Sequence, residues 1–160
     1  MKFWDYILAL LVPIIWGLGF AFAKAGLSEF PPLFLMGMRF SLAALTLAWF
    51  VSYPRGHLRE IFWIALVGSS IQYGLTFTGL SMIDASLAVI VIQLEVPFGV
   101  LLATIVFRER PGMQSIFGIL LAFGGIILLV GQPSLEGQIF AMFLTGSGAF
   151  MWAVGQIMVK

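Results

Sequence analysis

Residues 85–107 read ASLAVIVIQLEVPFGVLLATIVF, an apolar run in which Glu95 is the single charged side chain. An α-helix needs about 20 such residues to cross the hydrocarbon core of a bilayer. A strand of a membrane barrel needs only about ten residues, and they alternate in character. The run therefore predicts a transmembrane helix.

Five more apolar runs of similar length surround this one, and Pro, Gly and charged residues separate them. The six predicted helices cover residues 6–26, 33–53, 61–81, 85–107, 113–131 and 138–159. Of the 160 residues, 61% are hydrophobic and 9% are charged, whereas soluble domains carry about 25% charged residues. The predicted fold class is an all-α polytopic membrane protein with six transmembrane helices.

The same composition excludes several kinds of function. There is no cysteine, and the single histidine, His57, lies in a charged connector between Arg55 and Arg59. Disulfides, thiolate metal sites and histidine-based catalysis are therefore not expected. A net charge of +1 offers no footprint for nucleic acid. We expect no enzyme activity, cofactor or metal; the expected partners are the bilayer and a small molecule.

The distribution of Lys and Arg predicts the orientation of the chain, because these residues favour the cytoplasmic side. A cytoplasmic N-terminus places six of them on that side and none in the outer connectors. The six are Lys2, Arg55, Arg59, Arg108, Arg110 and Lys160. We therefore expect a multi-pass protein of the plasma (inner) membrane with its N-terminus in the cytoplasm.

Two helices share a short sequence pattern. Residues 16–24 read WGLGFAFAK and residues 152–160 read WAVGQIMVK, so that Trp, Gly and Lys recur at one offset. Five spans separate the starts of the two copies, which makes the second copy cross the membrane in the opposite direction. Inverted repeats of this kind are typical of secondary transporters, whose substrate site lies between the halves. Residues 1–137 are then one five-helix repeat, and residues 138–160 open a second.

Blocks of residues along the chain resemble the EamA family of the drug/metabolite transporter superfamily. The blocks are Trp16-Gly17, Pro31-Pro32, Gly37-Met38-Arg39-Phe40, Ala85-Ser86-Leu87-Ala88, Arg108-Glu109-Arg110, Gly118 and Gly124-Gly125. The segment from Phe30 to Phe40 and Glu136-Gly137-Gln138 are most similar to exporters of the cysteine/O-acetylserine type.

The resemblance implies ten helices in two inverted repeats and the export of small metabolites such as amino acids or their derivatives. The chain would then supply one repeat and the first helix of the next. Either the natural protein continues beyond Lys160, which we favour, or the sixth helix serves a homodimer. An acid at position 95 is not part of the family pattern.

Glu95 is the sharpest candidate for function, because a charge near the centre of a bilayer is costly and faces the bundle interior or a watery path. One interpretation is a site for a substrate ammonium or a coupled proton. The other is a structural ion pair with Lys24 or Arg39. Pro97 is expected to kink the helix beside it.

A polar stripe runs along the third predicted helix. Ser69, Gln72, Tyr73 and Thr76 are spaced i, i+3, i+4 and i+7 and share one helical face. The stripe fits the wall of a hydrophilic cavity and equally fits hydrogen bonds between helices.

Three large side chains inside the spans each allow two interpretations: Arg39 and Lys24 lie toward the outer end of their spans, and Trp16 lies deep in its helix. Arg39 fits an anion site or an ion pair with Asp84. Lys24 fits a snorkelling anchor better than a buried partner. Trp16 fits packing better than stacking on cargo. The predicted substrate path therefore contains Trp16, Arg39, Ser69, Gln72, Tyr73, Thr76 and Glu95.

The glycines inside the spans predict close packing between helices or between subunits, both at Gly118, Gly124 and Gly125 of the fifth span and at Gly68, Gly74 and Gly79 of the third. Taken together, the sequence favours a secondary transporter, or half of one, that exports small metabolites by alternating access. The alternative is a non-transporting scaffold or assembly subunit, in which the polar stripes would seal against one another.

Overall fold

The computed structural model describes residues 3–51, 56–108 and 110–159, and within these ranges the chain is helical and contains no strand. The elements in order are α1 (Phe3–Gly26), α2 (Pro32–Leu47), η1 (Ala48–Phe50), α3 (Leu58–Ala65), η2 (Leu66–Ile71), α4 (Gln72–Met82), α5 (Ala85–Ile92), α6 (Glu95–Phe107), α7 (Met113–Val130), η3 (Pro133–Gln138) and α8 (Ile139–Val159).

These elements form six spans long and apolar enough to cross a membrane within the described part of the chain. They are Asp5–Gly26, Pro32–Phe50, Leu58–Met82, Ala85–Phe107, Met113–Val130 and Ile139–Val159. Each corresponds to one predicted helix, with ends displaced by at most three residues, so the fold class is confirmed. The chain is an integral multi-pass membrane protein.

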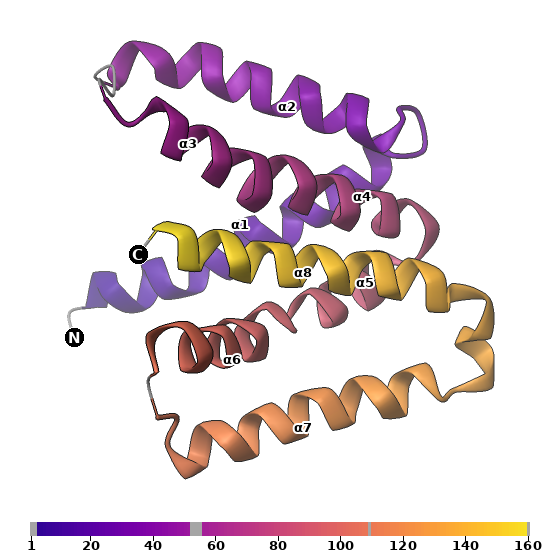
Figure 1. Cartoon of the computed structure of the whole chain (residues 1–160). Helices are drawn as coiled ribbons and strands as arrows, with labels where there is room; N and C mark the ends of the chain where they lie inside the picture. Colours follow the sequence, from indigo (N-terminus) through magenta and orange to yellow (C-terminus); the bar gives the residue numbers. More distant parts are fainter. Residues whose placement is uncertain (1–2, 52–55, 109, 160) are drawn as a thin grey trace.

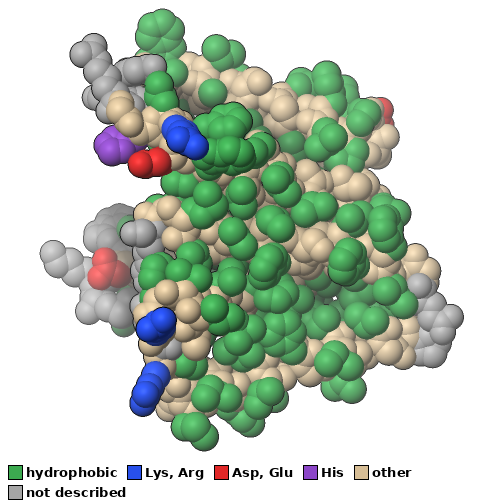
Figure 2. Space-filling view, viewed as in Figure 1, with side chains coloured by type: hydrophobic (Ala, Val, Ile, Leu, Met, Phe, Trp, Pro, Cys, Tyr) green, Lys and Arg blue, Asp and Glu red, His purple; other side chains and the backbone are tan. Residues whose placement is uncertain are grey.

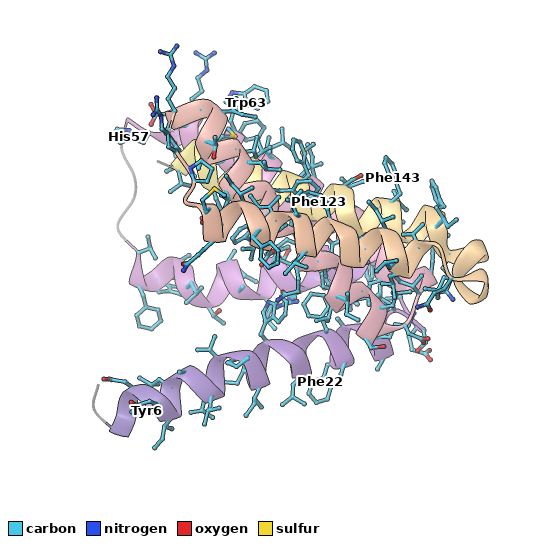
Figure 3. All side chains as sticks on the ribbon, turned by 90° about the horizontal axis from the view of Figure 1, so that it is seen from below. Tyr6, Phe22, His57, Trp63, Phe123 and Phe143 are labelled. Atoms are coloured by element: carbon cyan, nitrogen blue, oxygen red, sulfur yellow. The ribbon has the colours of Figure 1, made fainter. Side chains whose placement is uncertain are left out.

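Five of the six spans form one layer, and α8 lies at its centre (Figure 1). On one side of α8 lie α3 and α4, with α2 beyond them; on the other lie α5 and α6, with α7 at the far edge. The first helix, α1, runs behind this layer. Figure 3 shows Tyr6 and Phe22 of α1 pointing away from the other helices.

The outside of the bundle is apolar, and charge gathers at one end (Figure 2). The Lys, Arg and His side chains visible on this face lie where α3 begins and where α6 ends, the region of Arg59, His57 and Arg108. By contrast, the small buried interior includes polar Gln72, Thr76 and Thr145. This arrangement suits a lipid environment, since lipid tails, unlike water, solvate apolar side chains.

The central helix α8 packs on α4 through positions that have no room for a side chain. A Cβ at Gly155 would lie 2.6 Å from the Cα of Gly68, and a Cβ at Gly79 would overlap Thr145. The predicted close packing of the third span is thereby confirmed. The fifth-span glycines differ: Gly118, Gly124 and Gly125 meet no described atom within 4 Å. These glycines therefore make no close contact with the other described helices, because α7 lies at the edge of the layer. Their predicted packing against another subunit stays a prediction.

Three of the spans are not α-helical throughout. The second ends in the 3-10 turn η1, the third contains the π-helical turn η2, and the fourth breaks between α5 and α6. Pro97 explains the break: it has no N–H to donate to the carbonyl of Gln93, and its ring displaces that carbonyl. Gln93 and Leu94 instead form a tighter turn, in which the Leu94 N–H donates to the Val91 carbonyl at 3.1 Å. Glu95 follows the turn and begins α6.

Candidate functional site

A cavity of about 470 Å³ lies between α1 and the layer formed by the other spans. Its volume falls in the range typical of sites for small molecules. Residues from α1, α2, α4, α5, α6 and α8 line it: Val12, Ile15, Trp16, Gly19, Phe20, Arg39, Gln72, Tyr73, Thr76, Phe77, Ile92, Glu95 and Trp152.

Six of the seven residues predicted to form the substrate path line this cavity: Trp16, Arg39, Gln72, Tyr73, Thr76 and Glu95. They come from four different spans, so the tertiary structure brings them together. The seventh, Ser69, is half-buried and does not line the cavity. It lies in the π-helical turn η2. A π turn contains more residues than an α turn, so the spacing that assumed a regular α-helix no longer places Ser69 on the face of Gln72.

Glu95 is half-buried at the cavity wall. Because the fourth span breaks beside Pro97, Glu95 lies in the first turn of α6, where the helix dipole favours a negative charge. In the described part of the chain, no Lys or Arg nitrogen lies within 4.0 Å of its carboxylate. The interpretation of Glu95 as half of an ion pair with Lys24 or Arg39 is therefore not supported.

Arg39 supplies positive charge to the same cavity. Its side chain is exposed, and it makes no ion pair with Asp84 among the described residues. Asp84 instead precedes the first residue of α5, with an exposed side chain that forms no capping hydrogen bond. The cavity thus holds one carboxylate and one guanidinium that do not neutralise each other by direct contact.

Lys24 does not act as a snorkelling anchor, and that prediction is wrong. Its Nζ donates hydrogen bonds to the carbonyls of Leu80 at 2.8 Å and Ser81 at 3.1 Å. These carbonyls belong to the last turn of α4. The carbonyls of a last helical turn accept no hydrogen bond from an N–H of the same helix, because the helix ends there. A cation there satisfies the free carbonyls and the negative end of the helix dipole. Lys24 thereby ties the end of α1 to the end of α4.

Aromatic rings form much of the cavity wall. Trp16 meets Phe20 edge-on at a centroid distance of 4.9 Å, and Phe20 stacks on Phe77 at 6.0 Å. Tyr73 also stacks on Phe77, at a centroid distance of 5.6 Å. Trp16 therefore both packs against a neighbour and borders the cavity, so the two interpretations of this residue are not exclusive.

Sequence reasoning missed Trp152 as a cavity residue, although the short repeat already paired it with Trp16. The two tryptophans lie on α1 and α8, the first and last spans, and they border the same cavity. The shared sequence pattern was a usable signal, because in inverted-repeat transporters the substrate site lies between the two halves. Lys160, the last residue of the repeat, lies outside the described residues, as do Lys2, Arg55 and Glu109.

The described residues contain no group of three or more His, Cys, Asp or Glu side chains that could hold a metal ion. A helical membrane bundle with polar and charged side chains around an internal cavity has the architecture of a small-molecule transporter. The chain belongs to the EamA-like transporter family, whose sequence profile matches residues 3–131. The resemblance inferred from the sequence is thus confirmed, and the matched segment covers the first five spans.

Several curated relatives are named as efflux pumps or transporters. The chain is 38% identical to a probable amino-acid metabolite efflux pump of Escherichia coli and 39% identical to one of Salmonella typhimurium, over 98% of this chain and 53% of each relative. An uncharacterized transporter of Archaeoglobus fulgidus is 31% identical over 93% of this chain and 55% of that protein. The chain therefore spans about half the length of these relatives. No solved structure matches it.

Proposed function

We propose that the chain is part of a secondary transporter that exports small amino-acid-type metabolites by alternating access. The observation that carries the proposal is the cavity, in which Glu95 and Arg39 present opposite charges without pairing. A zwitterion carries the complementary pair: its ammonium suits Glu95, and its carboxylate suits Arg39. The names of the two efflux pumps at 38% and 39% identity point to the same class of cargo.

A scaffold function has less support. A protein that only packs its spans would seal polar side chains against each other, leaving no space around Glu95. Here Gln72, Tyr73 and Glu95 border a space of about 470 Å³. Such a volume beside costly intramembrane polar groups favours a molecule that enters and leaves.

The wider organisation of the transporter is part of this proposal. Residues 1–137 form one repeat and residues 138–160 open an inverted second repeat, supplied by a longer protein or by a homodimer partner. The N-terminus is cytoplasmic, in the plasma (inner) membrane, which agrees with the charged end seen in Figure 2. Export is driven by coupled protons or by the gradient of the cargo, and Glu95 is the group that would bind a proton or the ammonium.

The proposal is tested by transport into proteoliposomes that contain the full-length protein encoded by the gene. A panel of labelled neutral L-amino acids is compared with matched compounds that lack either the amino group or the carboxylate. We expect saturable transport of at least one zwitterion, with weaker competition by both kinds of analogue. Competition by either kind of analogue that equals competition by the amino acid itself would contradict the zwitterion site, and transport of no panel member would refute the assigned cargo class.

A further inference from the structure

A cluster of buried apolar side chains, which we call the apolar seal, closes the cavity at one end. Its members come from α1, α2, α4 and α5, and they are Ala23, Met36, Leu80 and Leu87. None of the four lines the cavity. Protein interiors are close-packed, so a polar molecule could pass here only if these side chains moved apart.

The order of residues along the four spans shows at which end of the cavity the seal lies. On α1 and α4 the residues that line the cavity precede the seal, and on α2 and α5 they follow it. On α1, for example, lining residues 12–20 precede Ala23, and on α5 the lining residue Ile92 follows Leu87. The seal therefore lies, in all four spans, on the side where α1 connects to α2 and α4 connects to α5. In the orientation proposed above, this is the outer side.

Lys24 joins two of these helices beside the seal. Its Nζ donates to the carbonyls of Leu80 at 2.8 Å and Ser81 at 3.1 Å, so the ammonium links α1 to α4. The Ser81 hydroxyl, by contrast, donates to the carbonyl of Thr78 within α4 itself, at 2.7 Å. Hydrogen bonds from a charged donor are about twice as strong as neutral ones. Lys24 therefore fastens α1 to α4 at the point where the cavity is closed.

Few other described contacts hold this end of α1 in place. Among the described side chains of α1, Ala23 alone is buried, and Figure 3 shows Phe22 pointing away from the other helices. Phe20 stacks on Phe77 of α4 at a centroid distance of 6.0 Å, and both rings border the cavity. Loss of the ammonium should therefore let the end of α1 separate from α4 and open the seal.

We propose that Lys24 is the latch of an outer gate. Its two hydrogen bonds keep the apolar seal closed, and cargo leaves the cavity toward the outside only when they break. The inference rests on the proposed function, because alternating access requires both a closed and an open state at this end of the cavity. It adds the side chain that favours the closed state.

The test measures how fast a cysteine in the cavity of the full-length protein reacts with an impermeant thiol reagent. Gly19→Cys supplies the cysteine, because Gly19 lines the cavity and a Cβ there meets no described atom within 4 Å. The reagent is added to intact cells or to inside-out vesicles, whichever exposes Ser28→Cys, so the result does not depend on the proposed orientation. Lys24→Met removes the charged donor and keeps an unbranched side chain. We expect it to raise the rate at least about tenfold, as for loss of one hydrogen bond to a charged group.

Four further variants complete the experiment. Lys24→Gln keeps neutral N–H donors and should raise the rate in the same direction, whereas Lys24→Arg keeps a charged donor and should leave the rate as in wild type. Ser28→Ala removes a hydroxyl that donates to the carbonyl of Ala25 at 2.6 Å, near the same end of α1, and should not change the rate. Gly146→Cys is the matched reporter on α8, since it is half-buried and does not line the cavity. Its reactivity should be the same with and without Lys24→Met.

Several outcomes would overturn the inference. An unchanged rate at Gly19→Cys in both Lys24→Met and Lys24→Gln would show that no latch exists. An equal rise at Gly19→Cys and Gly146→Cys would show a general loosening of the fold. If wild type transports amino acids and the rate is unchanged, the proposed function stands and Lys24 loses this role. If wild type transports no amino acid and Lys24→Met still exposes the cavity, the assigned cargo class falls and the latch stands.

Discussion

At the scale of single residues, Pro97 determines where Glu95 lies in the fourth span. Pro97 ends the regular hydrogen bonding of the fourth span, and the resulting turn places Glu95 at the start of a helix inside the membrane. The positive end of α6 then favours a negative charge that no Lys or Arg contacts directly. The local sequence thereby gives a polar site to an otherwise apolar span.

Substitution of Glu95 by Gln separates the two interpretations of this residue. Because no Lys or Arg of the described ranges lies within 4.0 Å of the carboxylate, Glu95→Gln should strand no charge and leave Tm in detergent unchanged or raised. A residue that binds an ammonium or a coupled proton should nevertheless be required, so we expect transport to fall at least about tenfold and to lose its dependence on external pH. Exposed Glu29 provides the control, and Glu29→Gln should change neither property. A loss of about 3–5 kcal/mol in stability for Glu95→Gln would instead indicate a broken buried ion pair.

At the scale of helices, close contacts at glycines hold α8 against α4 and η2. Gly155 meets Gly68, Gly148 meets Thr76, and Gly79 meets Thr145. Close approach of this kind matters in a bilayer, where helices associate by packing and hydrogen bonds rather than by burial from water. The contact between α8 and α4 also positions the polar residues of α4 at the cavity. Helix packing and the geometry of the cavity therefore depend on the same interface.

Alanine at Gly155 tests that interface. The new Cβ would lie 2.6 Å from the backbone of Gly68, so the helices must move apart, and we expect a loss of about 1–3 kcal/mol of stability, typical of overpacking. Gly146→Ala is the matched control on α8: its Cβ would meet only Val91 and Leu94 side chains at 3.7 Å or more. That variant should be neutral or slightly stabilising, as alanine favours helix. Equal stability of the two variants, measured by thermal unfolding in detergent, would contradict the contact.

At the scale of the whole molecule, the protein has one charged end and a long apolar surface. Positive residues in the connectors lie at the end where α3 and α7 begin, and the connector between α1 and α2, which contains Glu29, lies at the other end (Figure 1). A bilayer that spans the apolar region would place these two ends in different compartments. The bias of Lys and Arg then assigns the basic end to the cytoplasm.

Cysteine labelling tests this orientation, because the chain contains no cysteine of its own. His57 and Ser28 are both exposed and lie at opposite ends of the bundle. In intact cells, an impermeant thiol reagent should label Ser28→Cys but label His57→Cys only after the membrane is permeabilised. The reverse pattern would place the N-terminus outside.

The sequence alone determined the membrane class, the six spans and the family. These depend on local quantities: the length of an apolar run, the residues that bound it and short motifs in order along the chain. Glu95 and Arg39 could be identified for the same reason, since a charge within an apolar run is visible without a structure.

The tertiary structure decided which of these residues meet and which contacts they make. Ser69 does not lie on the expected face because the π-helical turn shifts the rotational position of the residues that it contains. Lys24 binds carbonyls at the end of α4, which are far from it in sequence. Trp152 and Trp16 line the same cavity. The buried amide oxygen of Gln72 has no hydrogen-bond partner in the described part of the chain. Each outcome depends on how spans cross in three dimensions, which the periodicity of a single helix does not specify.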